Sequence, residues 1–306
     1  MRVFVDDVRA LRFDDGTPVT AASGIAALGD GWVIAQDDAT SAAWRRPGRL
    51  TPVRVLPPVE DHDRFSEAQG TKRLKPDLEA AFPAEVDGER AVLLLGSGST
   101  ARRMRGVLVR PVNGDLVVEA GDLGPLYERV AQCLGLPLEH LNLEGASRHG
   151  PMVRWFNRGN PAAGVRSGSV DVPLDALVAA VLGRAGAGSV PVGQPRGYDL
   201  GKVEGVGLEV TDAVALPDGR VLLSAAAEDS PNAVDDGPVV ATALAVVDGE
   251  QVLAVEAIPE VGGHVHKIEG LALRGCRDHE VHLLAVVDDD DPGAPSAEIE
   301  LRAVLT

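Results

Sequence analysis

Apolar and polar positions alternate along this chain in a pattern that recurs five times. Each unit has a polar residue, a short strand of small and apolar residues, a Gly- or Asp-rich turn and a second apolar strand. Asp212–Glu228 is the plainest example, with a Pro-Asp-Gly turn between its two apolar segments. Such a turn between two short apolar segments predicts a β-hairpin. The units open at Ser23, Glu79, Glu144, Asp212 and Glu269.

The spacing of the units predicts their architecture. Their first polar residues are 56 to 68 residues apart, which leaves room for two further strands in each unit, such as 105–110 and 115–119 in the second. Four strands per unit describe a propeller blade, and an internal repeat of this length is typical of that fold. The sequence therefore predicts an all-β, five-bladed β-propeller with four-stranded blades. Residues 2–8 are expected to close the last blade, beside the strand at 298–305.

Two stretches depart from the β pattern. Leu123–Leu134 and Pro173–Leu182 place apolar residues at helical spacing, and we interpret both as short helical insertions. Gly-rich residues 184–197 offer an alternative boundary between two domains. We expect a single propeller domain over residues 1–306.

Composition supports an all-β chain and restricts its partners. The 306 residues include 35 Gly and 21 Pro, and the net charge is −17. An acidic surface disfavours binding to nucleic acid or to an anionic membrane. No leader or long apolar run is recognisable, so we expect a cytoplasmic protein. Cys133 and Cys276 lack metal-site spacing and are expected to be free thiols. The oligomeric state is left open.

The polar residues that open the units are candidate metal ligands. Equivalent positions on the inner strands of a propeller surround its axis, so Ser23, Glu79, Glu144, Asp212 and Glu269 are expected to form a ring. Carboxylates about 4 Å apart repel by roughly 4 kcal/mol per pair at an effective dielectric constant near 20. Protonation or a cation must relieve this repulsion, and oxygen ligands of uneven length favour Ca²⁺. Alternatively, each acid caps backbone N–H groups without a metal.

Candidate catalytic residues lie at the ends of the second strands, which return to the same face of the ring. Asp37 and Asp38 end the first such strand, Asn157 and Arg158 the third, and Asp288–Asp291 the fifth. Lys267 stands two residues before the fifth ring position, and the run at Asp288 could hold a second cation. The mouth of the channel is therefore the expected active site.

Several of these motifs resemble those of the calcium-activated nucleotidases, or apyrases. Asp37-Asp38-Ala-Thr is similar to an Asp-Asp-Arg-Thr-like turn of that family, and Glu144-Gly-Ala-Ser through Arg158 resembles its third blade. Lys267-Ile-Glu269-Gly-Leu resembles its closing metal-binding strand, and also phytase-like and other bacterial propeller families. The resemblance implies a five-bladed propeller with calcium in its central tunnel. Ala39, where the nucleotidases have a basic residue, and Asp212, where they have a hydroxyl, are departures.

The sequence thus leads to two hypotheses. In the first, the protein is a Ca²⁺-dependent hydrolase of a phosphate-containing, anionic small molecule. Asp37 or Asp38 would activate water while Arg158 and Lys267 hold the phosphate. In the second, the propeller is not catalytic, its metal is structural, and its mouth binds a ligand or a protein.

Overall fold

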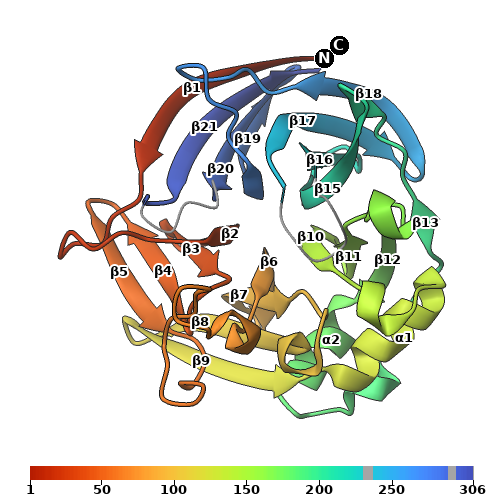
Figure 1. Ribbon diagram of the computed structural model, residues 1–306. Coiled ribbons are helices and arrows are strands. Elements are labelled where there is room, and N and C mark those ends of the chain that lie inside the picture. Colours follow the sequence, from red (N-terminus) through yellow and green to blue (C-terminus); the bar gives the residue numbers. More distant parts are fainter. Residues whose placement is uncertain (230–236, 289–293, 306) are drawn as a thin grey trace.

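Five antiparallel sheets form a ring around a central axis (Figure 1). The computed structural model describes residues 1–229, 237–288 and 294–305. The first two blades contain β2 (Ala22–Leu28), β3 (Gly31–Gln36), β4 (Ser41–Arg46) and β5 (Arg49–Arg54), then β6 (Leu78–Val86), β7 (Glu89–Gly96), β8 (Arg105–Val112) and β9 (Asp115–Asp122). The third contains β10 (Leu143–His149), β11 (Met152–Asn157), β12 (Gly168–Pro173) and the short β13 (Arg196–Gly197).

The fourth and fifth blades complete the ring. The fourth contains β15 (Val206–Ala215), β16 (Val221–Glu228), β17 (Val239–Asp248) and β18 (Gln251–Ala257), preceded by the short β14 (Lys202–Val203). The fifth contains β19 (Ile268–Arg277), β20 (Glu280–Val287), β21 (Ala297–Val304) and the N-terminal β1 (Arg2–Ala10). Since β1 pairs antiparallel with β21, the predicted closure by the N-terminal strand is confirmed. The predicted five-bladed propeller is confirmed as well.

Helices interrupt the strands where the sequence predicts them. α1 (Gly124–Leu134) joins the second and third blades, and α2 (Leu174–Val181) follows β12. Short 3₁₀ turns are η1 (Lys72–Leu74), η2 (Ala101–Arg103), η3 (Leu138–His140), η4 (Pro161–Ala163) and η5 (Ala187–Ser189). Residues 184–197, the alternative domain boundary, connect α2 to β13 within the third blade. Among the described residues, no helix is long and apolar enough to cross a membrane.

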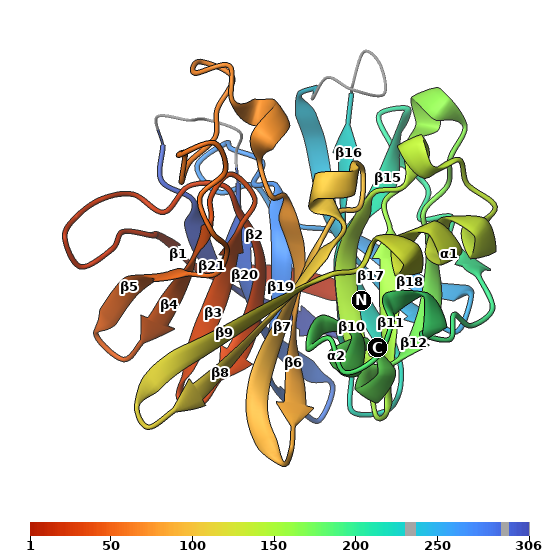
Figure 2. The ribbon, with the colours of Figure 1, turned by 90° about the horizontal axis from the view of Figure 1, so that it is seen from below.

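The hydrophobic core lies between neighbouring blades. Strands sandwiched between two sheets are apolar on both faces, as in Ala91–Leu95 of β7, every residue of which is buried. Both helices pack on the second and third blades, where Tyr127 of α1 meets Trp155 of β11 edge to face at 4.8 Å. Seen from the side, the segment joining β5 to β6 lies at one end of the ring (Figure 2). The blades therefore form a rigid frame for the loops at that end.

Each inner strand carries a β-bulge at the same position. The unpaired residues, which we call the bulge ring, are Ser23, Glu79, Glu144, Thr211 and Glu269. Small residues follow because the strands nearly touch: a Cβ on Gly24 would lie 2.6 Å from the carbonyl oxygen of Glu79. The expected alignment is therefore wrong by one residue in the fourth blade, where Thr211 and not Asp212 has the equivalent position.

Candidate functional site

A cavity of about 1310 Å³ opens at the mouth of the central channel. Its lining includes four residues of the bulge ring and one residue from each blade two positions earlier on the chain. These earlier residues, which we call the upper ring, are Ala21, Asp77, Asn142, Glu209 and Lys267. Both sets of residues line the cavity, so the two rings bring polar groups from all five blades to the mouth.

The hydroxyl members of the bulge ring hold neighbouring blades together. Ser23 Oγ donates a hydrogen bond to the carbonyl oxygen of Leu78 at 2.5 Å, and Thr211 Oγ1 donates to that of Ile268 at 2.7 Å. In both cases the acceptor directly precedes the glutamate of the next blade's bulge. The repeated contact supports the structural equivalence of Ser23 and Thr211. Only the glutamates of this ring thus bring ionisable groups to the cavity.

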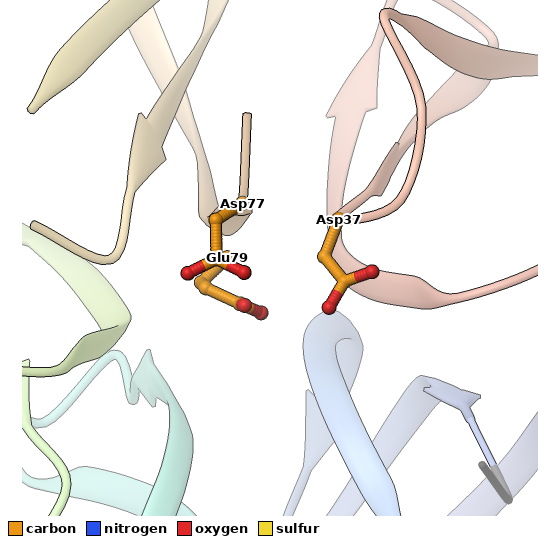
Figure 3. A group of neighbouring side chains, drawn as sticks. All are labelled: Asp37, Asp77 and Glu79. Atoms are coloured by element: carbon orange, nitrogen blue, oxygen red, sulfur yellow. The ribbon is translucent and has the colours of Figure 1, made fainter. Parts of the chain in front are cut away.

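One group of charges lies between the first two blades. Figure 3 shows Asp37 facing Asp77 and Glu79 across the mouth, and an oxygen of each lies within 4.8 Å of the others. The ammonium of Lys75, at the end of the β5–β6 connection, lies 2.5 Å from Asp37 Oδ2 and 2.6 Å from Asp77 Oδ1. Arg103 Nη1 reaches Asp77 Oδ2 at 2.8 Å. We call these five residues the Lys75 cluster.

The backbone explains how Asp77 enters this cluster. Ala21 and Asp77 occupy equivalent places before their inner strands, and both have positive φ values of 49° and 57°. Aspartate tolerates this left-handed region better than most residues. Ser97 Oγ also donates to Asp77 Oδ2, and the Ser97 N–H donates to the Asp77 carbonyl oxygen. Asp77 is thus fixed by its backbone conformation, by Ser97 and by two cations.

A second group of charges joins the third, fourth and fifth blades. Arg158 contacts Glu144 Oε1 at 3.2 Å and Glu228 Oε2 at 2.7 Å. Lys267 Nζ lies 3.0 Å from Glu269 Oε1 and 3.5 Å from Glu228 Oε2. We call these five residues the Arg158 cluster. Asn142 Nδ2 additionally donates to Glu144 Oε1 at 2.6 Å.

Burial and neighbouring charges move the pKa values of these acids in opposite directions. Burial, reinforced by the charges of Asp77 and Asp37, raises the pKa of Glu79 well above its usual range. Although burial opposes it, the charges of Lys75 and Arg103 lower the pKa of Asp77. Burial raises the pKa of Glu144 to about 7 against the effect of Arg158.

The remaining acids follow the same physical rules. Burial raises the pKa of Asp37 despite its contact with Lys75. In Glu228, the charges of Lys267 and Arg158 outweigh burial and lower the pKa to about 2. Each cluster therefore contains one acid whose pKa is lowered and another whose pKa is raised. Paired carboxyl groups whose pKa values are pushed apart are a common arrangement for acid–base catalysis.

Most of the predicted site residues meet in this cavity. Its lining contains Ser23, Asp37, Glu79, Glu144, Arg158, Lys267 and Glu269, and also Asp288. Asp38 is absent from the lining, and its Oδ2 accepts a hydrogen bond from the Thr20 hydroxyl at 3.0 Å. Burial, and then the charge of Asp37, raise the Asp38 pKa to about 6. The rest of the predicted acidic run, Asp289–Asp291, lies outside the described residues.

Asp212 has a different environment from the one predicted. Its side chain is fully buried, and its Oδ2 accepts a hydrogen bond from the Leu271 N–H at 2.6 Å. Burial raises the pKa of Asp212 well above the usual range, although backbone hydrogen bonds oppose this shift. Because the bulge places Thr211 at the ring position, Asp212 bonds to the adjoining inner strand and does not line the cavity.

Sequence reasoning missed the residues that neutralise the ring. Lys75 lies in the β5–β6 connection and Arg103 in η2, outside the repeated strands. The acid that both contact, Asp77, lies just before β6. Glu228 was recognised only as a strand end. One signal could have revealed part of the set: a polar residue stands two positions before the ring residue in four of the five blades.

The sequence also predicts a divalent cation at the mouth of the channel. The two clusters together contain six carboxyl groups, Asp37, Asp77, Glu79, Glu144, Glu228 and Glu269, and four cationic groups, Lys75, Arg103, Arg158 and Lys267. The carboxyl groups thus outnumber the cationic groups by two, and the pKa values of Glu79 and Glu144 are raised. Two protons or one divalent cation would balance this excess, so the donor set fits a hard cation.

The family of the chain follows from a match over most of its length. Residues 71–292 match DUF6910, a family of unknown function. The chain belongs to this family. A search of curated proteins finds no match to this DUF6910 member.

Several solved structures match this chain at low sequence identity. A luciferin-regenerating enzyme is 11% identical, with 94% of this chain and 80% of that chain covered and a TM-score of 0.43. A gluconolactonase from Xanthomonas campestris is 9% identical, with coverages of 98% and 91% and a TM-score of 0.39. A GDP-Man-dependent mannosyltransferase from Leishmania mexicana is 12% identical, with coverages of 99% and 90% and a TM-score of 0.43. At this similarity the function must be argued from the DUF6910 site itself.

Proposed function

We propose that the mouth of the propeller is the active site of a hydrolase that uses carboxyl groups as proton donors and acceptors. The observation that carries the proposal is the pairing of acids with opposed pKa values in one cavity, Asp77 with Glu79 and Glu228 with Glu144. A group with a pKa near 7 can both take and return a proton at neutral pH. Glu144 suits this role because it lines the cavity.

The other predicted catalytic residues receive revised roles. Asp37 lines the cavity and is the better candidate for orienting a water molecule, whereas Asp38 is not part of the lining. Arg158 and Lys267 hold Glu144, Glu228 and Glu269, and their positive charges would attract a substrate oxygen. Their first function is thus to place the acids.

The charges of the site bear on the class of substrate. Each of Lys75, Arg158 and Lys267 already contacts two carboxyl groups, so a phosphate would have to displace a carboxylate from a cation. Carboxylate oxygens accept hydrogen bonds and do not donate them. A small uncharged molecule with hydroxyl or N–H groups therefore fits better than the phosphate-containing substrate, which we retain as the second candidate.

We further propose that the site binds Ca²⁺ or a similar hard cation in place of two protons. Asp37, Asp77 and Glu79 would hold it, because an oxygen of each lies within 4.8 Å of the others. When bound, such an ion would polarise a substrate oxygen as a Lewis acid. A non-catalytic propeller with a structural ion is the competing proposal.

An activity screen with matched variants tests the enzyme proposal. Uncharged esters and glycosides are compared with nucleotides and sugar phosphates, each with and without Ca²⁺. For an accepted substrate, Glu144→Gln is expected to lower kcat at least about 100-fold, the usual contribution of general acid–base catalysis. Glu60→Gln, at an exposed residue outside the cavity, is the control. If no compound is turned over, or if Glu144→Gln retains full kcat, the enzyme proposal fails.

Calcium binding has its own test. Added Ca²⁺ is expected to raise the melting temperature of chelator-treated protein, because the ion binds the folded state. Glu79→Gln should reduce this rise, whereas Glu60→Gln should preserve it. Equal melting temperatures with Ca²⁺ and with chelator would refute the metal site without affecting the proposal for Glu144.

A further inference from the structure

We propose that Ser167 and Glu209 are positioning residues that hold Arg158 in its bridge between Glu144 and Glu228. This goes beyond the proposed function and rests on it only in giving Arg158 a role towards the substrate. Glu209 belongs to the upper ring and lies two residues before Thr211. Ser167 directly precedes β12, at the end of the loop that starts with Arg158.

The hydroxyl of Ser167 connects the third and fourth blades below that loop. Its Oγ donates a hydrogen bond to Glu209 Oε2 at 2.6 Å. The same oxygen accepts hydrogen bonds from the Gly159 N–H at 3.1 Å and the Val210 N–H at 3.0 Å. Only 1% of Ser167 is exposed, so no solvent competes for these bonds. A buried hydroxyl with one donated and two accepted bonds has a fixed orientation.

Gly159 links this hydroxyl to Arg158, its neighbour in sequence. A Cβ at Gly159 would overlap the carboxylate of Glu209, so a glycine is needed where the acid passes over the backbone. On the other side, the Arg158 N–H donates to the carbonyl oxygen of Asn142 at 2.8 Å. The backbone on both sides of the Arg158 side chain is therefore held by hydrogen bonds.

The position of the guanidinium requires such support. Arg158 Nη1 lies 3.2 Å from Glu144 Oε1 on the third blade, and its Nη2 lies 2.7 Å from Glu228 Oε2 on the fourth. A change in the spacing of these blades would lengthen at least one contact. Ser167 and Glu209 fix that spacing directly beside Arg158, since one belongs to each blade. The charge of Arg158 also acts on Glu209, whose own pKa burial raises.

The order of the Arg158 side chain can be measured without a substrate. Solvent exchange of its guanidinium N–H hydrogens, followed by ¹⁵N NMR, reports whether both carboxylates still hold it. Ser167→Ala and Glu209→Ala are expected to accelerate this exchange on the order of tenfold, since each removes a hydrogen bond near the guanidinium. Glu209→Gln should restore slow exchange, because its amide oxygen can still accept from Ser167.

Controls separate this effect from general destabilisation. Ser189→Ala removes an exposed hydroxyl that bonds locally to Gly186, and it should leave Arg158 exchange unchanged. If Ser167→Ala does not fold, the half-buried Glu209 still provides the test. Slow Arg158 exchange in folded Ser167→Ala or Glu209→Ala protein would overturn the proposal. A loss of kcat is expected in the same variants, and its absence with fast exchange would count against the proposed function instead.

Discussion

The Lys75 and Arg158 clusters neutralise buried acids in different ways. In the Arg158 cluster, the cations stand at strand ends: Arg158 follows β11 and Lys267 precedes β19. In the Lys75 cluster, Lys75 comes from the 23-residue connection between β5 and β6, and Arg103 from η2. The propeller frame therefore supplies the charges of one cluster, whereas irregular segments supply those of the other. The Lys75 cluster should accordingly depend more on loop structure.

Among the variants that test this difference between the clusters, removal of Lys75 should have the largest effect on stability. Lys75→Met leaves Asp37 and Asp77 without the ammonium that contacts both. Loss of one partner of a buried ion pair usually costs 3–5 kcal/mol, so we expect the free energy of unfolding in urea to fall by about 4 kcal/mol. Lys72→Met, at an exposed pair with Glu67, should cost less than about 1 kcal/mol. Equal stabilities for both variants would contradict the assigned role of Lys75.

The second largest expected effect is a difference between the two clusters in how stability depends on pH. The folded state raises the pKa of Glu144 from 4.5 to about 7, so its contribution is complete below pH 4.5 and is lost as the pH rises through 7. In metal-free buffer, Glu144→Gln should remove this loss and gain about 3 kcal/mol at pH 8 relative to pH 4.5. Asp38 lies beside the Lys75 cluster, and Asp38→Asn should remove a loss of stability that occurs between pH 3.8 and about 6. Identical pH windows for the two variants would show that the acids titrate as one group.

Removing the hydroxyls of the bulge ring should have the smallest effect on the free energy of unfolding. Ser23 and Thr211 each donate to a carbonyl oxygen on the next blade, one beside each cluster. Ser23→Ala and Thr211→Val should each lower the unfolding free energy by about 1–2 kcal/mol, because a buried acceptor loses its donor. Similar costs would support their equivalence across the ring. Unchanged stability of Thr211→Val would indicate that Ser224, which also contacts Thr211, compensates for the lost hydroxyl.

The sequence predicts the blades and helices better than it predicts the residues of the site. Hairpin turns and strand pairs repeat, so the blade number, the closing strand and both helices could be read from apolar periodicity. The fourth ring position could not, because Thr211 and Asp212 are both polar and the sequence does not show that the bulge falls on Thr211. Lys75 and Arg103 were missed because contacts made by irregular connections leave no periodic signal. The expected roles of the site residues and the single domain over residues 1–306 stay predictions.

The pairing of β1 with β21 has a consequence for how this site is assembled during synthesis. Residues 297–304 must leave the ribosome before the last blade can pair with residues 2–10, so the ring closes late. The mouth takes groups from Asp37 in the first blade to Glu269 in the fifth. The mouth as a whole, with groups from all five blades, is therefore complete only after β1 has paired with β21.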